Sequence, residues 1–344
     1  MIFIARASAE TVTITTYNVE HFNDHFEGRR LTTRKVAKES DEAKEMVAAI
    51  KKANDEDNWE VAETILDPKV DPDIIMIQEC CSPEDLDYFN KRWLKGAYET
   101  VMILPTNTGD RVQNVAMMVK PGFKIIQKKD QYYKELDPVK KHIVTSRKGE
   151  PDRVEDRPTL FARGPSFFEM ESPGGYHFWV GTNHMKSKFG NGPEVTAWRN
   201  REAVRIHAIM VELTKAGPGD LIFLGDMNDE SGLDEFEKEN GGDTIGNILG
   251  PPDDGFVLAT RPLLARGEIS FGGYTRSDHR SFIDHAFASA DMAKKIKSVS
   301  VYTDHLAPVA SDHYPVTLKI ELPTGTPTKP APKTVPAELQ DAMP

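Results

Sequence analysis

The chain has 344 residues, of which 39% are hydrophobic, and its formal net charge is −11 at pH 7. This length suits one large domain or two ordinary ones, and the hydrophobic content is sufficient for a buried core. The acidic balance argues against sequence-blind binding to nucleic acid through a uniformly basic surface, but it is compatible with a nuclease that has a locally basic cleft. The two cysteines, Cys80 and Cys81, are neighbours, which argues against structural disulfides and a cysteine-type zinc site.

Residues 1–10 resemble the end of a signal peptide. Ala7-Ser8-Ala9 is typical of a signal-peptidase site, and the short apolar run Ile2–Ile4 precedes it, although this run is too short for a working signal. We interpret residues 1–10 as a signal-peptide remnant and expect export to the periplasm or the exterior, with a cytoplasmic location as the alternative. No apolar run is long enough to span a membrane, so we expect no stable membrane insertion. We also expect a monomer.

The first half of the chain predicts strands separated by polar connections. Residues 11–17 are rich in β-branched side chains and predict a strand, and residues 74–77 predict a second, buried one. Between them, apolar side chains at helical spacing predict a helix over residues 40–52 and a further helical turn over residues 60–66. Ser82, followed by Pro83 and two acids, is typical of a helix start.

The middle of the chain combines strands with a charged segment. Four strands are predicted, over residues 112–119, 158–162, 166–170 and 176–182. The segment 124–157 is mixed in charge, and we interpret it as a solvent-exposed loop or hairpin, with a substrate-facing basic insertion as the alternative. Residues 197–215 form the clearest helix, because their apolar side chains recur at helical spacing and Gly217-Pro218 end the pattern.

The last third begins with a short buried strand that ends in polar residues. Leu221–Leu224 are apolar, and the chain continues as Gly225, Asp226, Met227, Asn228 and Asp229. In an extended backbone Asp226 and Asn228 point to the same side, so they face one site together, unless they form an ordinary Asp-Asn turn. A short helix over residues 233–238 and strands over residues 281–288, 299–302 and 315–320 follow. Residues 323–344 are Pro-rich and predict a disordered tail.

Many of the predicted strands end in carboxylate, amide or imidazole side chains. These side chains are Asn18 with Glu20, Glu79, Asn183 with His184, Asp226 with Asn228, Asp284, and Asp312 with His313. One α+β domain over residues 11–322, with two sheets packed face to face and helices outside, places these ends on one rim. Oxygen ligands without a cysteine cluster suit Mg²⁺ or Mn²⁺. The set is what metal-assisted hydrolysis of a phosphate ester requires.

Six motifs carry a family resemblance. They are TYNVE, IIMIQE, GTNHMKS, LGDMND, FIDHAF and ASDHYPV, and they occur in this order between Thr11 and Ile320. In these motifs the chain resembles the endonuclease/exonuclease/phosphatase superfamily of deoxyribonuclease-like, metal-dependent phosphoesterases. The resemblance implies a four-layer α/β/β/α sandwich, with two mixed β-sheets packed face to face and helices outside, and a divalent-metal site for phosphate-ester hydrolysis.

The resemblance also implies metal ligands. Asn18 and Glu79 match the metal-site pair of the superfamily, with Glu79 as the main ligand. Glu20 stands where some members have Asp, which implies a secondary metal contact. Asp312 matches a ligand of the metal or of a second metal.

The catalytic residues follow from the same motifs. His184 matches the histidine that binds or protonates the phosphate, and Asp226 matches the residue that aligns and activates the attacking water. Asn228 matches the partner of Asp226 on the phosphate. Asp284 matches the acid that pairs with the last histidine, His313.

The substrate class is the least determined feature. Arg157 resembles the phosphate-contacting arginine of deoxyribonuclease-like members, with an ordinary surface arginine as the alternative, and Lys186, Lys188 and Arg201 are candidates for tracking a nucleic-acid backbone. We therefore predict a secreted, Mg²⁺- or Mn²⁺-dependent phosphodiesterase that acts as a nuclease on DNA or RNA. The main alternative is a phosphomonoesterase or a phospholipid-headgroup phosphodiesterase, and an inactive binding module ranks third.

Overall fold

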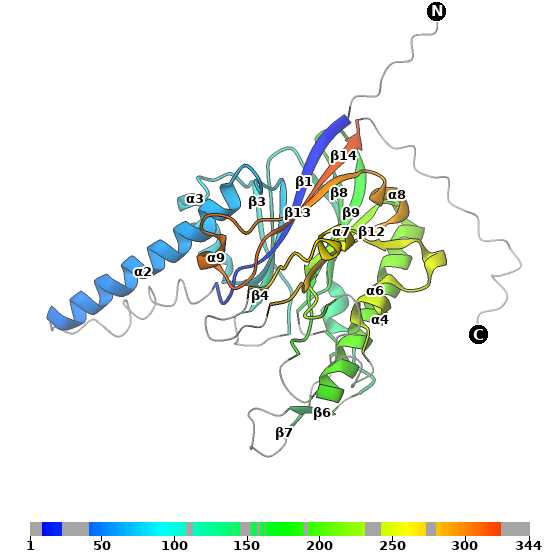
Figure 1. The fold of residues 1–344 in the computed structure, drawn as a ribbon, viewed down its shortest axis with the longest axis horizontal. Coiled ribbons are helices and arrows are strands. Elements are labelled where there is room, and N and C mark those ends of the chain that lie inside the picture. The colour runs from blue at the N-terminus through cyan, green and yellow to red at the C-terminus, as the bar shows by residue number, and fades with distance from the viewer. Residues whose placement is uncertain are drawn as a thin grey trace, which may run out of the picture.

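The computed structural model describes residues 9–22, 41–107, 113–139, 141–144, 153–156, 159–161, 163–188, 192–230, 242–272 and 280–324. Two six-stranded mixed sheets pack face to face, and helices cover their outer faces (Figure 1). This arrangement confirms the predicted α+β sandwich.

The first sheet is formed by both ends of the domain. Its strand order is β13 (Ile296–Val301), β14 (Val316–Pro323), β1 (Ala9–Asn18), β2 (Ile74–Cys80), β4 (Asn114–Val119) and β3 (Thr100–Leu104). Strands β1 and β14 are antiparallel, and their register pairs Ala9 with Pro323. Ala9 and Glu10 therefore belong to the sheet, although the sequence analysis placed them in the signal-peptide remnant. Pro323, which the sequence analysis placed in the tail, is the last residue of β14.

The second sheet carries the middle of the chain. Its strand order is β11 (Phe256–Leu258), β12 (Asp284–Ser289), β10 (Leu221–Asp226), β9 (His177–His184), β8 (Ser166–Glu171) and β5 (Lys124–Lys129). A separate hairpin pairs β6 (Lys141–Val144) with β7 (Arg153–Asp156). The charged segment 124–157 thus contains an edge strand and a hairpin.

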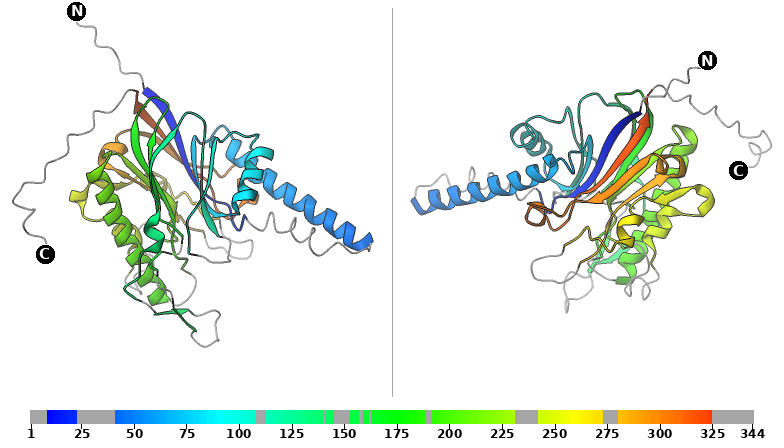
Figure 2. Two further views of the ribbon diagram at one scale, coloured as in Figure 1. Left: turned by 180° about the vertical axis from the view of Figure 1, so that it is seen from behind. Right: turned by 45° about the horizontal axis from the view of Figure 1, so that its top comes forward.

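Helices cover the outer faces of the two sheets. On the first sheet lie α3 (Pro83–Arg92) and the C-terminal part of α2 (Asp41–Leu66), whose N-terminal part projects away from the sheet. On the second sheet lie α4 (Gly192–Ala216) and α6 (Thr244–Leu249), as Figure 2 shows from two further sides. Shorter helical segments connect strands, namely η1 (Gln131–Lys134), η2 (Pro252–Asp254), α7 (Arg261–Ala265), α8 (Ala290–Ala293) and α9 (Ala307–Ala310). Within the described residues, no helix is both long enough and apolar enough to cross a membrane.

The alternation of side chains along the strands explains the layers. In β2, Ile74 and Met76 join the apolar cluster between the sheets, whereas Ile75 and Ile77 join the cluster under α2 and α3. In β10, Leu224 faces the other sheet and Phe223 belongs to the cluster under α4. Because both faces of these strands are buried, their sequences are continuously apolar rather than alternating.

Several predicted boundaries differ from the observed ones. The expected helix 40–52 and helical turn 60–66 are one helix, α2, because residues 53–59 contain neither Gly nor Pro to end it. The predicted strand 158–162 is wrong, since within the described part of this range Thr159 forms only an isolated bridge to Leu136. The sequence reading missed β3, β5 and β11, and the expected helix 233–238 lies outside the described residues.

Candidate active site

Strand register brings the polar strand ends to one rim. Strands β1 and β2 are parallel, with Asn18 opposite Gln78, so that Glu79 follows at the same edge. Strands β9 and β10 are also parallel, and β12 runs antiparallel to β10, so that Asp226 pairs with both His184 and Asp284. Because β1 also contacts β10 across the sandwich, the ends of the two sheets meet. These polar side chains, far apart in sequence, therefore lie close together.

The backbone at this rim is unusual in two ways. A Cβ atom on Gly225 would lie 2.1 Å from the carbonyl oxygen of Asn183, so only glycine allows the close approach of β10 to β9 that sets Asp226 beside His184. Glu20, Glu79 and Asn228 have positive φ angles of 38°, 56° and 52°. Such left-handed conformations are costly for non-glycine residues and cluster at functional sites.

Asp226 lies at the centre of the site and is 1% exposed. Its Oδ2 accepts a hydrogen bond of 2.9 Å from Asn18 Nδ2, and its Oδ1 accepts one of 2.8 Å from the main-chain N–H of Asn228. Burial raises the pKa of Asp226 to about 7, with the Asp284 carboxylate raising it further and the His313 imidazolium opposing the rise. A carboxyl group with this pKa suits a general base near neutral pH.

His313 forms a dyad with Asp284. Its Nδ1 lies 2.8 Å from Asp284 Oδ2, and Ser270 Oγ accepts the main-chain N–H of Asp284 at 3.0 Å. Burial alone would lower the pKa of His313, but the Asp284 carboxylate, with help from Asp226, raises it to about 10. His313 is therefore an imidazolium at neutral pH, and its Nε2 lies 3.9 Å from Asp226 Oδ2.

His184 differs from His313 in its charge. Its Nε2 lies 3.3 Å from Asp226 Oδ2 and 4.0 Å from Glu79 Oε1. Burial, together with the nearby Arg163 guanidinium, holds the pKa of His184 well below its usual range. A neutral imidazole binds a phosphate oxygen as an N–H donor, which favours the binding role over the protonating role.

Three carboxylates converge beside this cluster. The main-chain N–H of Asp312 donates to Glu20 Oε2 at 3.2 Å, and Glu79 Oε2 accepts the main-chain N–H of His21 at 3.0 Å. Burial raises the pKa of Asp312 to about 6, and the charges of Glu20 and Glu79 raise it as well. This concentration of negative oxygen atoms fits a hard divalent cation, which would relieve the repulsion.

Among the described residues, one group at the rim has the spacing of metal ligands, and it is not the trio Glu20, Glu79 and Asp312. One ligand atom each of Asp226, Asp284 and His313 lies within 4.8 Å of the others. However, His313 Nδ1 already contacts Asp284, and a protonated imidazole has no lone pair for a metal ion. The donor chemistry of Glu20, Glu79 and Asp312, three oxygen ligands that bear negative charge, suits a hard cation, although their ligand atoms are more widely spaced than those of this group.

The candidate substrate-binding cations have partners within the protein. The Arg201 guanidinium donates two hydrogen bonds, of 3.0 and 2.9 Å, to the buried carboxylate of Asp137, and Lys188 Nζ lies 3.0 Å from Asp229 Oδ1. Lys186 Nζ donates to the Ser187 carbonyl at 3.2 Å. Arg157, the fourth candidate, lies outside the described residues.

Sequence reasoning missed residues that hold the site in place. Ser311 Oγ donates to the carbonyl of Asn18 at 2.8 Å and accepts the main-chain N–H of His313, so it joins two motif segments. Its place directly before Asp312 in the last motif was a signal that could have identified it. Arg163, whose guanidinium donates to the Met185 carbonyl, lies in no motif and had no such signal.

Comparisons with known proteins found a matching family and similar solved structures. The family described as Endonuclease/Exonuclease/phosphatase family matches residues 15–313. A Bacteroides thetaiotaomicron protein of this family has a similar structure, with 16% identity, a TM-score of 0.57, and coverage of 92% of this chain and 99% of that one.

Two further solved structures show the same fold. A mannosyl-6-phosphatase of Bacteroides thetaiotaomicron has 17% identity and a TM-score of 0.57, with 90% of this chain and 99% of that chain covered. The catalytic domain of human Nocturnin, solved with a bound sulfate anion, has 14% identity and a TM-score of 0.51, with 91% and 96% covered. No curated protein sequence gave a match.

Proposed function

Because the chain belongs to the endonuclease/exonuclease/phosphatase family, whose members hydrolyse phosphate esters, we propose that it is a divalent-metal-dependent phosphodiesterase with a nuclease activity on DNA or RNA. The observation that carries this proposal is the arrangement around Asp226. A buried carboxylate with a pKa near neutrality lies beside the imidazolium of His313 and the neutral imidazole of His184. This combination offers a base, a positive charge and an N–H donor within one site.

The roles of these side chains follow from their charges. Asp226 takes a proton from the attacking water while the water oxygen bonds to phosphorus and the bond from phosphorus to the ester oxygen breaks. His313, oriented by Asp284, stabilises the negative charge that develops on the phosphate oxygens, and His184 donates an N–H to one of them. The ester oxygen leaves on the opposite side and gains a proton from solvent. Asn228 holds the Asp226 carboxylate through its main-chain N–H.

A metal ion fits the neighbouring carboxylates. Glu79, Asp312 and Glu20 would hold Mg²⁺ or Mn²⁺, with Asn18 completing the set through its amide oxygen, which also accepts the Glu20 main-chain N–H. When bound, such an ion supplies positive charge to the phosphoryl and leaving oxygens. The fit rests on the oxygen donors of these carboxylates and on their mutual repulsion: burial raises the pKa of Asp312, and the charges of Glu20 and Glu79 raise it further.

One observation favours the alternative, a phosphomonoesterase or a phospholipid-headgroup phosphodiesterase. Lys188 and Arg201 would have to track a nucleic-acid backbone, but both form ion pairs with carboxylates of the protein, and Asp137 is buried under Arg201. Their charge is thus less available to phosphates than the sequence alone suggests. The fold is also shared with a mannosyl-6-phosphatase, which makes a small ester a concrete alternative.

The test is one panel of substrates assayed in parallel. The purified chain is incubated with plasmid DNA, single-stranded RNA, bis-p-nitrophenyl phosphate, p-nitrophenyl phosphate, mannose 6-phosphate and sphingomyelin, with Mg²⁺, with Mn²⁺ and with EDTA. We expect metal-dependent cleavage of plasmid DNA or RNA and of the small diester, and about a hundredfold slower cleavage by Asp226→Asn. Hydrolysis of only the monoesters or only sphingomyelin would assign the alternative, and full activity in EDTA would exclude the metal-dependent mechanism.

A further inference from the structure

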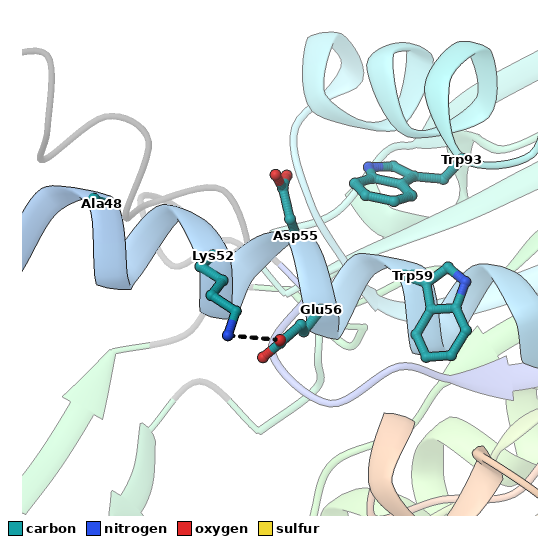
Figure 3. Close-up of a pocket in the computed structure, with 6 residues that line it drawn as sticks. All are labelled: Ala48, Lys52, Asp55, Glu56, Trp59 and Trp93. Atoms are coloured by element: carbon teal, nitrogen blue, oxygen red, sulfur yellow. Dashed lines mark ion pairs between the residues drawn. The ribbon is translucent and has the colours of Figure 1, made fainter.

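A groove separate from the active site lies between α2 and α3. It is a hollow of about 450 Å³ lined by Ala48, Lys52, Asp55, Glu56, Trp59 and Trp93, as Figure 3 shows. We call it the α2 groove. None of these residues belongs to the rim of polar strand ends, so the catalytic chemistry does not explain them.

Two tryptophans provide the apolar walls of the α2 groove. Trp59 has 44% of its surface exposed, and Trp93 is half-buried. The Nε1 atom of Trp93 is buried and has no hydrogen-bond acceptor among the described residues. The other two tryptophans of the chain, Trp179 and Trp198, are each 2% exposed and belong to the core under α4. A solvent-exposed indole beside a hollow is a typical anchor for a partner.

The groove and the part of α2 around it carry more carboxylates than cations. Asp55 and Glu56 line it, and the groove's own lysine, Lys52, is paired with Glu56 at 3.5 Å. On the same helix, burial raises the pKa values of Asp57 and Glu60, and neighbouring carboxylates raise them further. Negative charge therefore exceeds the positive charge that local side chains supply. A positively charged partner would relieve this repulsion, whereas nucleic acid or an anionic membrane would increase it.

One wall of the groove already holds a cation. The guanidinium of Arg92 lies 4.8 Å from the ring centroid of Trp93, and its NH2 lies 4.0 Å from Asp55 Oδ2. At this wall the protein thus binds a guanidinium between an indole face and a carboxylate. Trp59, on the opposite wall, has no such cation among the residues that the structure describes.

The shape of the surface favours a peptide over a small cation. Trp59 also lines a second hollow of about 340 Å³, together with Glu63, Asp67, Tyr302 and other residues. The two hollows adjoin at Trp59, which lines both of them. A ligand that fills both must extend over several residues, and it meets carboxylates in each hollow.

We propose that the α2 groove binds a basic peptide segment of a partner protein, with an arginine or lysine side chain placed against Trp59 and Asp55. A second copy of this chain is a poorer occupant, because an isologous contact would bring two acidic surfaces together. The groove lies on the helical layer of the first sheet, so binding there does not require the catalytic groups.

The probe is hexa-arginine amide, compared with a hexa-citrulline peptide of the same length and shape but without charge. Binding is followed by tryptophan fluorescence, since Trp59 and Trp93 line the groove, and by calorimetry at physiological salt with saturating Mg²⁺. We expect saturable binding of hexa-arginine and at least tenfold weaker binding of hexa-citrulline. Trp59→Ala should weaken hexa-arginine binding about tenfold. The double variant Asp55→Asn, Glu56→Gln should weaken it and flatten its salt dependence.

Matched control variants lie on the neighbouring helix. Tyr88 is also an exposed aromatic residue, 38% exposed, and Asp87 is an exposed acid on α3, but neither lines the groove. Tyr88→Ala and Asp87→Asn should bind hexa-arginine as the wild type does, and all variants should keep the wild-type circular dichroism and the wild-type phosphoesterase rate.

Three results would overturn the proposal. The first is unchanged binding by Trp59→Ala and by the double acid variant, and the second is an equal loss in the control variants. The third is concentration-dependent self-association that Trp59→Ala abolishes, which would assign the groove to a second copy of the chain. None of these outcomes depends on whether the protein is a nuclease.

Discussion

The replacement Asp226→Asn tests the proposed mechanism most directly. The variant keeps the size of the side chain but replaces one carboxylate oxygen by an amide NH₂. In the wild type both oxygens accept hydrogen bonds, from Asn18 Nδ2 and from the Asn228 main-chain N–H. The two donors approach different oxygens of Asp226, and an asparagine has only one oxygen, so its NH₂ group faces one of the donors. The charge that attracts a proton from water and faces the His313 imidazolium is lost as well.

The size of the effect follows from the role of this charge. Loss of one group that acts in the transition state costs on the order of a hundredfold in kcat, or about 2.7 kcal/mol of barrier. Substrate binding depends on other groups, so KM should change little. Since the pKa of Asp226 is raised to about 7, we also expect the wild-type kcat to rise with pH through about 7, as the carboxylate form becomes populated. This rise should be absent in the variant.

The assay is steady-state kinetics with bis-p-nitrophenyl phosphate, with circular dichroism as the folding control. Asp220→Asn is the matched control, because Asp220 directly precedes the same strand at its opposite end, where it pairs with Lys295. That variant should keep the wild-type kcat. Asp284→Asn should lower kcat less than Asp226→Asn does, and the double variant should be little worse than Asp226→Asn because both groups serve one step. A folded Asp226→Asn protein with near wild-type kcat would refute this mechanism.

Four further predictions concern the metal, the charges and the tail. EDTA should abolish activity, and Mg²⁺ should raise the melting temperature of the wild type but not of Glu79→Gln; an equal rise in both would remove Glu79 from the metal site. Burial raises the pKa of Glu202 to about 7, above its unfolded value of 4.5, so its stabilisation is present below pH 4.5 and is lost as the pH rises through 7. Glu202→Gln removes this loss of stability. The change that it makes in the free energy of unfolding should be more stabilising at pH 8 than at pH 4, by up to about 3 kcal/mol. Urea unfolding of both proteins at the two pH values measures this difference. Lys186→Glu should weaken plasmid cleavage and flatten the salt dependence of this cleavage, while the rate on the small diester stays unchanged. Arg201→Glu should lower the melting temperature, because the buried carboxylate of Asp137 loses its cation. Truncation after Thr324 should leave activity and melting temperature unchanged, and a large loss of either would show that the tail packs on the domain.

Sequence patterns predicted most of the central strands and the site motifs because these features are local. A continuous apolar run such as Ile74–Ile77 indicates a strand buried on both faces. The polar residues that follow this run can be identified from the sequence without knowledge of the fold. The edge strand β5 was missed for the opposite reason. Its residues Lys124, Gln127 and Lys128 give a polar sequence, since an edge strand exposes much of its surface to solvent.

The meeting of the site residues and the state of their charges were decided by the tertiary structure. Asp226 and His313 are 87 positions apart in the printed sequence. Strand pairing within the second sheet sets Asp284 beside Asp226, and the packing of the two sheets brings His313, which precedes β14, to both carboxylates. The same packing makes His184 neutral and His313 cationic, although their sequence surroundings look alike, because a pKa depends on burial and on the charges nearby. It also gives Arg201 the buried partner Asp137, 64 residues away. Residue types are local properties of a sequence, whereas charge, burial and partnership depend on contacts between distant segments, and these exist only in the folded chain.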